Sequence, residues 1–242
     1  MSVVLTRPTP ATRLSLRPPP LENGDCLAAP EFLRRYEAMP QVKKAELING
    51  VVYMGSPVRY LQHGQPDGWI QTWLGVYAAH TPGAECVPNT TAQLDIDNVP
   101  QPDAMLRIHE DCGGQSRVDE QDYLAGAPEL VVEIAASTAS IDLRDKLRAY
   151  RRNGVREYVV WRTQDRALDW FVLREGDYQP LAPAAKGVFH SAVFPGLWLA
   201  VKPLLALDGA AVLATLQAGL KSAEHRAFVA RLAAARRNGQ RR

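Results

Sequence analysis

The sequence is poor in cysteine and has no long apolar run. Its three cysteines, Cys26, Cys86 and Cys112, lie far apart among 242 residues, so they match neither a disulfide framework nor a zinc knuckle. No stretch reaches the roughly 18 consecutive apolar residues that a membrane-spanning helix needs. The N-terminal residues contain no continuous apolar core, which argues against a secretory signal. We therefore expect a soluble, cytoplasmic protein.

The sequence also lacks the composition of a disordered, collagen-like or coiled-coil chain. Apolar residues make up 46% of it and charged residues 22%, which is enough to build a core in one large domain or two small ones. The sequence has no internal repeat and no glycine-rich phosphate-binding loop. The lack of such a loop argues against a hydrolase of small phosphorylated substrates.

Charge is distributed unevenly along the chain. The net charge is +2, of which residues 1–30 carry +1 and residues 206–242 carry +5, so residues 31–205 are acidic, at about −4. An acidic centre is not typical of a protein that coats nucleic acid with a broad basic face, but it is compatible with a cleft lined by carboxylates. The C-terminal residues have apolar side chains at helical spacing between arginines, which predicts a solvated or partner-packing basic helix rather than a nucleic-acid-binding arm.

Three segments follow from these patterns. Residues 1–29 form a proline-rich segment that we expect to be extended, since six of the eighteen prolines lie within residues 1–30. Residues 30–205 contain the regular hydrophobic patterns and form the predicted domain. Residues 206–242 form a basic helical extension.

The hydrophobic patterns of the central segment predict a mixed α/β or α+β domain. Asn49-Gly50 between two apolar runs is a strong β-hairpin signal, because both turn positions take positive φ. Helices are predicted over residues 30–39, 60–79 and about 140–153. Strands are predicted over residues 84–95, 104–108, 129–135, 157–162, 167–174 and 197–201. Strands interleaved with few helices favour a mixed sheet.

Two carboxylates stand at strand positions and are the first candidate site residues. Asp103 follows Pro102 and leads directly into an apolar strand. Glu133 interrupts the apolar run of residues 130–135, in a strand that would otherwise be buried on both faces. An ionised carboxylate there is costly unless it is paired, hydrogen-bonded or metal-bound. Glu133 is therefore either a structural partner of a lysine or arginine, or a functional residue.

Lys146 is the third candidate. It lies one turn after Asp142 and one turn before Tyr150, so the three side chains share a helix face. Asp142 and Lys146 alone would be an ordinary surface ion pair. Together with Asp103 and Glu133, however, Lys146 completes the set that metal-dependent phosphodiester hydrolysis requires. Two carboxylates hold a hard cation, the cation activates water, and a lysine stabilises charge on the phosphate.

These residues belong to a longer series of motifs. In order, the series comprises residues 46–50 (ELING), His63, residues 101–103 (QPD), residues 127–134 (APELVVEI), Asp142, Lys146, Tyr150 and residues 154–161 (GVREYVVW). The series resembles the Uma-type putative restriction endonuclease family of the PD-(D/E)XK nuclease superfamily. The resemblance extends from about residue 31 to residue 205.

The resemblance implies a restriction-endonuclease-like core, in which helices flank a mixed β-sheet and a β-hairpin precedes it. It implies that Asp103 and Glu133 are metal ligands and that Glu46 is an accessory acid. Lys146 would be the superfamily lysine, displaced to the following helix, because Ala135 stands two positions after Glu133 in place of a lysine.

His63 and Tyr150 are two further candidate residues, and one motif departs from the family. His63 either contacts phosphate or water in the site, or caps a helix or lies at the surface. Tyr150 is expected to be a packed aromatic whose hydroxyl reaches a site carboxylate. Ala136 and Ser137 stand where the family often has serine and proline, which changes the loop that leads to the helix of Lys146.

The function implied is a Mg²⁺-dependent endonuclease acting on DNA, with Mn²⁺ as a possible substitute. A homodimer is expected, because cleavage of both strands by one site per chain favours a two-fold assembly. The alternative is a non-catalytic module of the same fold that binds nucleic acid or a protein. The acidic centre favours this alternative, whereas the presence of Asp103, Glu133 and Lys146 together argues against it.

Overall fold

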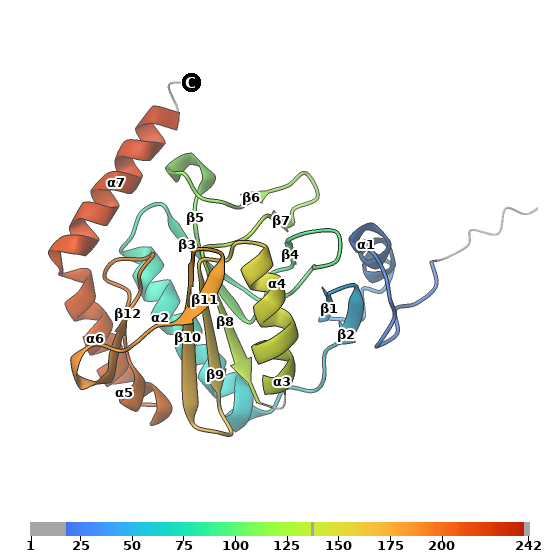
Figure 1. The fold of residues 1–242 in the computed structure, drawn as a ribbon, viewed down its shortest axis with the longest axis horizontal. Helices are drawn as coiled ribbons and strands as arrows, with labels where there is room; N and C mark the ends of the chain where they lie inside the picture. The colour runs from blue at the N-terminus through green and yellow to red at the C-terminus, as the bar shows by residue number, and fades with distance from the viewer. Residues whose placement is uncertain (1–17, 137, 240–242) are drawn as a thin grey trace, which may run out of the picture.

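The computed structural model describes residues 18–136 and 138–239 (Figure 1). The proline-rich segment, residues 1–29, was expected to be extended. Its residues 1–17 lie outside the described residues, and so does Ser137. Of the remaining N-terminal residues, Leu21 is buried, and Cys26 forms an isolated antiparallel bridge with Val51. The chain is therefore tied to the folded part before its first helix begins.

The first elements form a small unit at one side of the molecule (Figure 1). Helix α1 (Ala29–Glu37) is followed by strands β1 (Ala45–Ile48) and β2 (Val51–Met54), which pair antiparallel. Asn49 and Gly50 connect the strands with φ angles of 51° and 75°. These left-handed conformations are those that an Asn-Gly hairpin turn requires, so the predicted hairpin is confirmed.

The central sheet has six strands in the order β11-β10-β9-β8-β5-β3. The strands are β3 (Ala84–Pro88), β5 (Ala104–Ile108), β8 (Leu130–Ala135), β9 (Glu157–Arg162), β10 (Ala167–Arg174) and β11 (Asp177–Pro180). Strands β8 and β9 are parallel, and the other neighbours are antiparallel. The sheet is mixed, as predicted, and its central strands are buried along almost their whole length.

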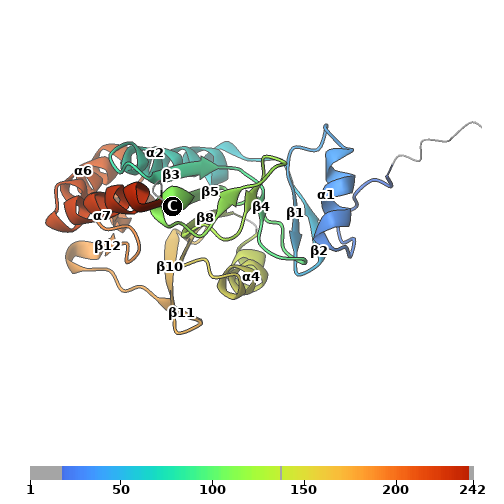
Figure 2. The same cartoon turned by 90° about the horizontal axis from the view of Figure 1, so that it is seen from above.

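Helices cover both faces of this sheet (Figure 2). A π-helical turn, η1 (Tyr60–Gly64), continues into α2 (Gln65–Ala79) on one face. The parallel connection from β8 to β9 crosses the other face through α3 (Ala139–Ile141), a second π-helical turn η3 (Asp142–Lys146) and α4 (Leu147–Arg152). A parallel strand pair needs such a crossover. Gly154, with φ of 81°, follows this helix at the predicted stop.

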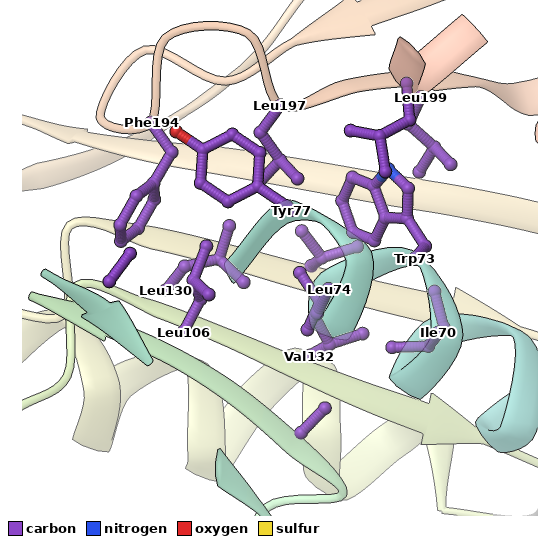
Figure 3. Close-up of a cluster of buried hydrophobic side chains, with 14 of the residues drawn as sticks. Ile70, Trp73, Leu74, Tyr77, Leu106, Leu130, Val132, Phe194, Leu197 and Leu199 are labelled. Atoms are coloured by element: carbon purple, nitrogen blue, oxygen red, sulfur yellow. The ribbon is translucent and has the colours of Figure 1, made fainter. Parts of the chain in front are cut away.

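The main core lies between the sheet and α2 (Figure 3). Ile70, Trp73, Leu74 and Tyr77 of α2 are fully buried, as their helical spacing predicts, and pack against the sheet. In β8, the residues at positions 130, 132 and 134 face this core, whereas those at positions 131 and 135 belong to a second core under α4. Because successive side chains of a strand alternate between faces, Glu133 points to the α4 side.

The remaining elements extend this framework. They are β4 (Ala92–Gln93), η2 (Glu110–Cys112), β6 (Arg117–Val118), β7 (Leu124–Ala125), η4 (Ala185–Gly187), β12 (Val188–His190), β13 (Trp198–Ala200), α5 (Val201–Leu205), α6 (Gly209–Leu220) and α7 (Ala223–Gly239). The single strand expected over residues 84–95 is divided into β3 and β4, because Asn89 between them takes a positive φ of 45°. The sequence patterns did not predict β6, β7, β11 or β12.

The two C-terminal helices are part of the folded core. Val212 and Leu216 of α6, together with Phe228 and Leu232 of α7, belong to the main hydrophobic cluster. The imidazole of His225 lies within hydrogen-bonding distance of the Thr81 hydroxyl, which follows α2 (2.9 Å). None of the helices in the described ranges is long and apolar enough to cross a membrane.

Candidate active site

Strand register brings Asp103 and Glu133 to the same place. Ala104 of β5 pairs with Val132 of β8, so Asp103, one residue earlier, lies beside Glu133, one residue later. The Ile134 backbone N–H donates to Asp103 Oδ2 at 2.8 Å, which ties the two strands at this level. Both carboxylate side chains are buried. Two antiparallel neighbours thus place two carboxylates next to each other at the start of β5.

Lys146, the last residue of η3, reaches Glu133 and two further carboxylates. Its Nζ lies 2.9 Å from Glu133 Oε1, 2.9 Å from Glu46 Oε1 and 3.7 Å from Asp142 Oδ1. The sequence offered an ordinary surface pair as one interpretation of Asp142 and Lys146, and this interpretation is wrong, because both side chains are almost completely buried. Asp142 also accepts a hydrogen bond from the Thr138 hydroxyl.

Tyr150 shares the helix face of Lys146 and reaches the same oxygen. Its hydroxyl donates to Glu133 Oε1 at 2.8 Å, and its ring packs on Tyr158 with centroids 4.9 Å apart. Burial raises the pKa of Glu133 above its ordinary value, and the nearby Lys146 ammonium opposes this shift and favours the ionised form. Burial, and then the negative charge of Glu133, raise the pKa of Tyr150 well above its usual range. Tyr150 is therefore a neutral donor to the glutamate.

Glu46 enters from the hairpin. Its Oε1 accepts the backbone N–H of Gln101 at 2.8 Å and forms an ion pair with the Lys146 ammonium. Leu47, the next residue, forms a backbone bridge with Val99. The residues just before Asp103 are therefore attached to β1 by backbone and side-chain bonds. These contacts explain how two motifs more than fifty residues apart meet at one site.

Lys44 is a site residue that the sequence analysis missed. Its Nζ lies 2.9 Å from Asp103 Oδ1, and its side chain is 30% exposed. Burial alone would lower the pKa of Lys44, but Glu46, Asp103 and Glu133 raise it above its ordinary value. Lys44 and Glu46 are two residues apart at the start of β1. This alternation was a signal that both side chains reach the same side of the hairpin.

His63 contacts the site rather than lying free at the surface. Its Nε2 is 3.2 Å from Asp103 Oδ2, and the hydrogen bond with Asp103 raises the pKa of His63. Burial would raise the pKa of Asp103, but His63 and Lys44 more than offset this and hold the pKa well below its usual range. His63 lies in η1 and Lys146 in η3. Single π-helical turns are rare and are frequently found at functional sites.

The acidic and basic groups do not balance. Four carboxylates (Glu46, Asp103, Glu133 and Asp142) face two ammonium groups and one imidazole. No group of three or more histidine, cysteine, aspartate or glutamate side chains is arranged as a metal cage in the described part of the chain. The available donors are instead a pair of carboxylates, and Glu133 Oε2 makes no hydrogen bond with any described residue, whereas Oε1 accepts two.

A pair of carboxylates suits a hard divalent cation such as Mg²⁺. Mg²⁺ binds oxygen ligands, keeps several waters and is commonly held by one or two carboxylates together with substrate phosphate, rather than by an all-protein cage. Asp103 and Glu133 supply such a pair. Ala135, two residues after Glu133, lines a cavity of about 250 Å³ together with Ala136, Ala139, Arg162 and neighbouring residues. The hydroxyl of Thr163 donates to the Gln62 carbonyl in η1 at 2.8 Å, so the turn after β9 is joined to the segment that carries His63.

Comparisons with known proteins identify the family and the fold. Residues 29–202 match the Uma2 family, described as a putative restriction endonuclease. The crystal structure of a putative nuclease belonging to DUF820 from Anabaena variabilis ATCC 29413 is similar, with a TM-score of 0.54 and 12% sequence identity over 72% of this chain and 97% of that chain. At this identity the likeness shows the fold alone. No curated protein matches the chain. Because the family match spans most of the residues and contains every candidate site residue, this chain belongs to the Uma2 family.

Proposed function

We propose that this protein is a divalent-metal-dependent endonuclease that hydrolyses phosphodiester bonds of DNA. The observation that carries the proposal is the strand register that sets Asp103 beside Glu133, with a lysine ammonium 2.9 Å from the glutamate. The family description and the nuclease-like fold of the structural neighbour support the nuclease class. The specific substrate, DNA, rests on the resemblance to restriction endonucleases and is therefore an inference from fold.

Asp103 and Glu133 would hold the cation, for which Mg²⁺ is the natural choice and Mn²⁺ a substitute. When bound, such an ion polarises a phosphate oxygen and lowers the pKa of a bound water, which supplies a nucleophile at neutral pH. The donor chemistry supports this assignment, because both ligands are carboxylates and Glu133 has one oxygen without a hydrogen bond from the described residues.

Neighbouring residues of the site orient these two carboxylates and keep them ionised. Lys146 and Tyr150 both donate to Glu133 Oε1 and so fix the orientation of the carboxylate. His63 and Lys44 keep Asp103 ionised. Glu46 holds Lys146 in place and is the accessory acid. A lysine beside the carboxylates stabilises the negative charge that develops on the phosphate during hydrolysis, and the family resemblance assigns this role to Lys146.

We further propose that the enzyme acts in the cytoplasm as a homodimer. Each chain carries one site, and two sites related by a two-fold axis would cut the two strands of a duplex. The mass of the protein in solution tests the assembly, and a strictly monomeric protein would contradict it.

A cleavage assay tests the function. Single- and double-stranded DNA are incubated with wild-type protein and with Glu133→Gln, in Mg²⁺, in Mn²⁺ and in EDTA. We expect cutting only with metal, and a loss of about 10²-fold or more in the variant, because an amide cannot replace an anionic ligand. Asp177→Asn is the matched control, because Asp177 is an exposed acid paired with Arg151 at the surface, and we expect it to cut like wild type.

Two results would contradict the proposal. Cutting that persists in EDTA, or that persists undiminished in Glu133→Gln, would mean that another site or another protein is responsible. Protein that binds DNA but never cuts it would support the non-catalytic module instead. Calorimetry measures the binding of Mn²⁺ to wild type and to Glu133→Gln. If wild type binds Mn²⁺ but cuts no DNA, the substrate is missing, whereas if it binds no Mn²⁺, the metal site is missing.

A further inference from the structure

Two lysines approach the candidate carboxylates, and they differ in their access to solvent. The Lys146 side chain is 6% exposed and the Lys44 side chain is 30% exposed. Both ammonium groups lie 2.9 Å from a carboxylate oxygen, Lys146 from Glu133 and Lys44 from Asp103. Proximity to the metal ligands therefore does not distinguish them, whereas access to a substrate does.

The contacts of Lys146 leave it little freedom to contact a phosphate. An ammonium has three protons, and three carboxylates surround this one, those of Glu46, Glu133 and Asp142. If the ammonium turned away toward a substrate, it would leave buried carboxylates without compensation, which is strongly unfavourable. Lys146 is thus suited to hold Glu133 and Glu46 in place.

The contacts of Lys44 are different. Its one ion-pair partner in the described part of the structure is Asp103, so two of its three protons are free for a further acceptor. Its backbone is fixed, because the Gly55 N–H donates to the Lys44 carbonyl at 3.0 Å. The end of the hairpin also packs closely here, since a Cβ added to Gly55 would lie only 3.1 Å from Lys44 Cβ. Lys44 therefore presents a partly exposed side chain from a fixed stem, and its ammonium lies beside one of the two proposed metal ligands.

From this difference we propose that Lys44 is the lysine that contacts the scissile phosphate, and that Lys146 is a positioning residue. The proposal rests on the nuclease function proposed above. Lys44 would donate to a non-bridging phosphate oxygen while remaining close to Asp103, and no proton is transferred in this contact. The role that the resemblance gives to one lysine is thereby divided between two, one on the hairpin and one on the crossover helix.

The test compares four variants of the full-length protein. Lys44→Met removes the charge and keeps the length of the side chain, and Lys44→Arg restores a cation. Lys43→Met is the matched control, because Lys43 is the exposed neighbour, whose ammonium bonds only to the Pro40 carbonyl among the described residues. Lys146→Met removes the buried lysine. Thermal unfolding of each variant shows which of them are folded at the assay temperature.

Two quantities are measured for the folded variants. The first is the affinity for a short fluorescent DNA duplex at several KCl concentrations, with Ca²⁺ in place of Mg²⁺. The second is the rate of cleavage in Mg²⁺. For Lys44→Met we expect the salt slope of log K to fall by roughly 0.9, the loss of one phosphate contact, and kcat/KM to fall by about 10²–10³-fold. We expect Lys44→Arg to recover most of the salt slope, and Lys43→Met to behave as wild type.

The outcomes separate the two proposals. If wild type cleaves DNA, and Lys44→Met matches Lys43→Met in both salt slope and cleavage, the proposed role of Lys44 is wrong. The proposed nuclease activity is then unaffected. If Lys146→Met rather than Lys44→Met loses the salt slope, the two roles are reversed and the proposal is overturned. If Lys44→Met only melts at a lower temperature, Lys44 merely ties the hairpin to Asp103. Protein that binds but does not cleave contradicts the nuclease, and the salt slope still decides whether Lys44 contacts phosphate.

Discussion

Glu133 shows how a single residue can combine structure and chemistry. It replaces an apolar side chain in a fully buried strand, where an unpaired carboxylate would cost several kcal/mol. The Lys146 ammonium and the Tyr150 hydroxyl both bond to its Oε1 and so compensate for the lost hydration. Since both donors bond to the same oxygen, the other oxygen stays available for a ligand. The structural pairing and the metal-binding hypothesis are therefore compatible.

Replacement of Tyr150 by phenylalanine isolates one of these two bonds. We expect Tyr150→Phe to destabilise the protein by about 1–3 kcal/mol, because a buried hydrogen bond to a charged group is lost and the ring is kept. Cleavage should fall less than in Glu133→Gln, since Lys146 still orients the carboxylate. Urea unfolding and the cleavage assay measure the two effects. Unchanged stability would show that the hydroxyl does not bond to Glu133 in solution.

At the scale of elements, the site depends on which side chains each strand turns to which face. The alternation along β8 sends its apolar residues at 130, 132 and 134 to α2 and sends Glu133 to the crossover helix. The same alternation along β9 sends Glu157 toward the α2 side, where its carboxylate accepts the Ser191 hydroxyl at 2.6 Å and the Ala192 N–H at 2.7 Å. Glu157 thus anchors the connection between β12 and β13.

The buried carboxyl of Glu157 makes the stability of the protein depend on pH. Burial raises the pKa of Glu157 from 4.5 to about 7, so the folded protein holds a proton between these values that the unfolded chain has released. Stability must then decrease as the pH rises through this window, by on the order of 3 kcal/mol for this group. Glu157→Gln stays neutral and should lack this decrease. The difference in unfolding free energy between the two proteins, measured by urea from pH 4.5 to 8, should therefore grow with pH, and a constant difference would contradict the assignment.

At the scale of the whole molecule, sequence patterns predicted the elements that are long and periodic. The hairpin, the strands at 104–108, 157–162 and 167–174 and the buried face of α2 all agree with the structure. Asp103, Glu133 and Lys146 were found because each lies on a predicted strand or helix or directly before one, and the crossover helix brings Lys146 to Glu133. The two-residue strands β4, β6 and β7 are too short to show a period.

Lys44 was missed for a different reason. Its contact with Asp103 joins residues 59 positions apart and depends on how the hairpin docks against the segment before β5. That docking depends in part on backbone bonds between Leu47 and Val99, and backbone bonds leave no trace in the residue types. Sequence periodicity therefore cannot predict the site contacts that depend on how a small unit docks against a distant segment of the chain.

The C-terminal helices give the last whole-molecule prediction. The sequence predicted a basic helical extension over residues 206–242, and five large apolar side chains of its helices belong to the main core: Val212, Leu216, Leu220, Phe228 and Leu232. At about 1.5–3 kcal/mol for each buried side chain, their loss approaches the roughly 5–15 kcal/mol that stabilises a whole domain. We therefore expect a chain truncated after Leu205 to be unfolded and to show no cooperative thermal transition. A chain truncated after Gly239 keeps both helices and is the control. A truncated chain that melts cooperatively at the temperature of this control would contradict this prediction and show that the rest of the chain folds without residues 206–239.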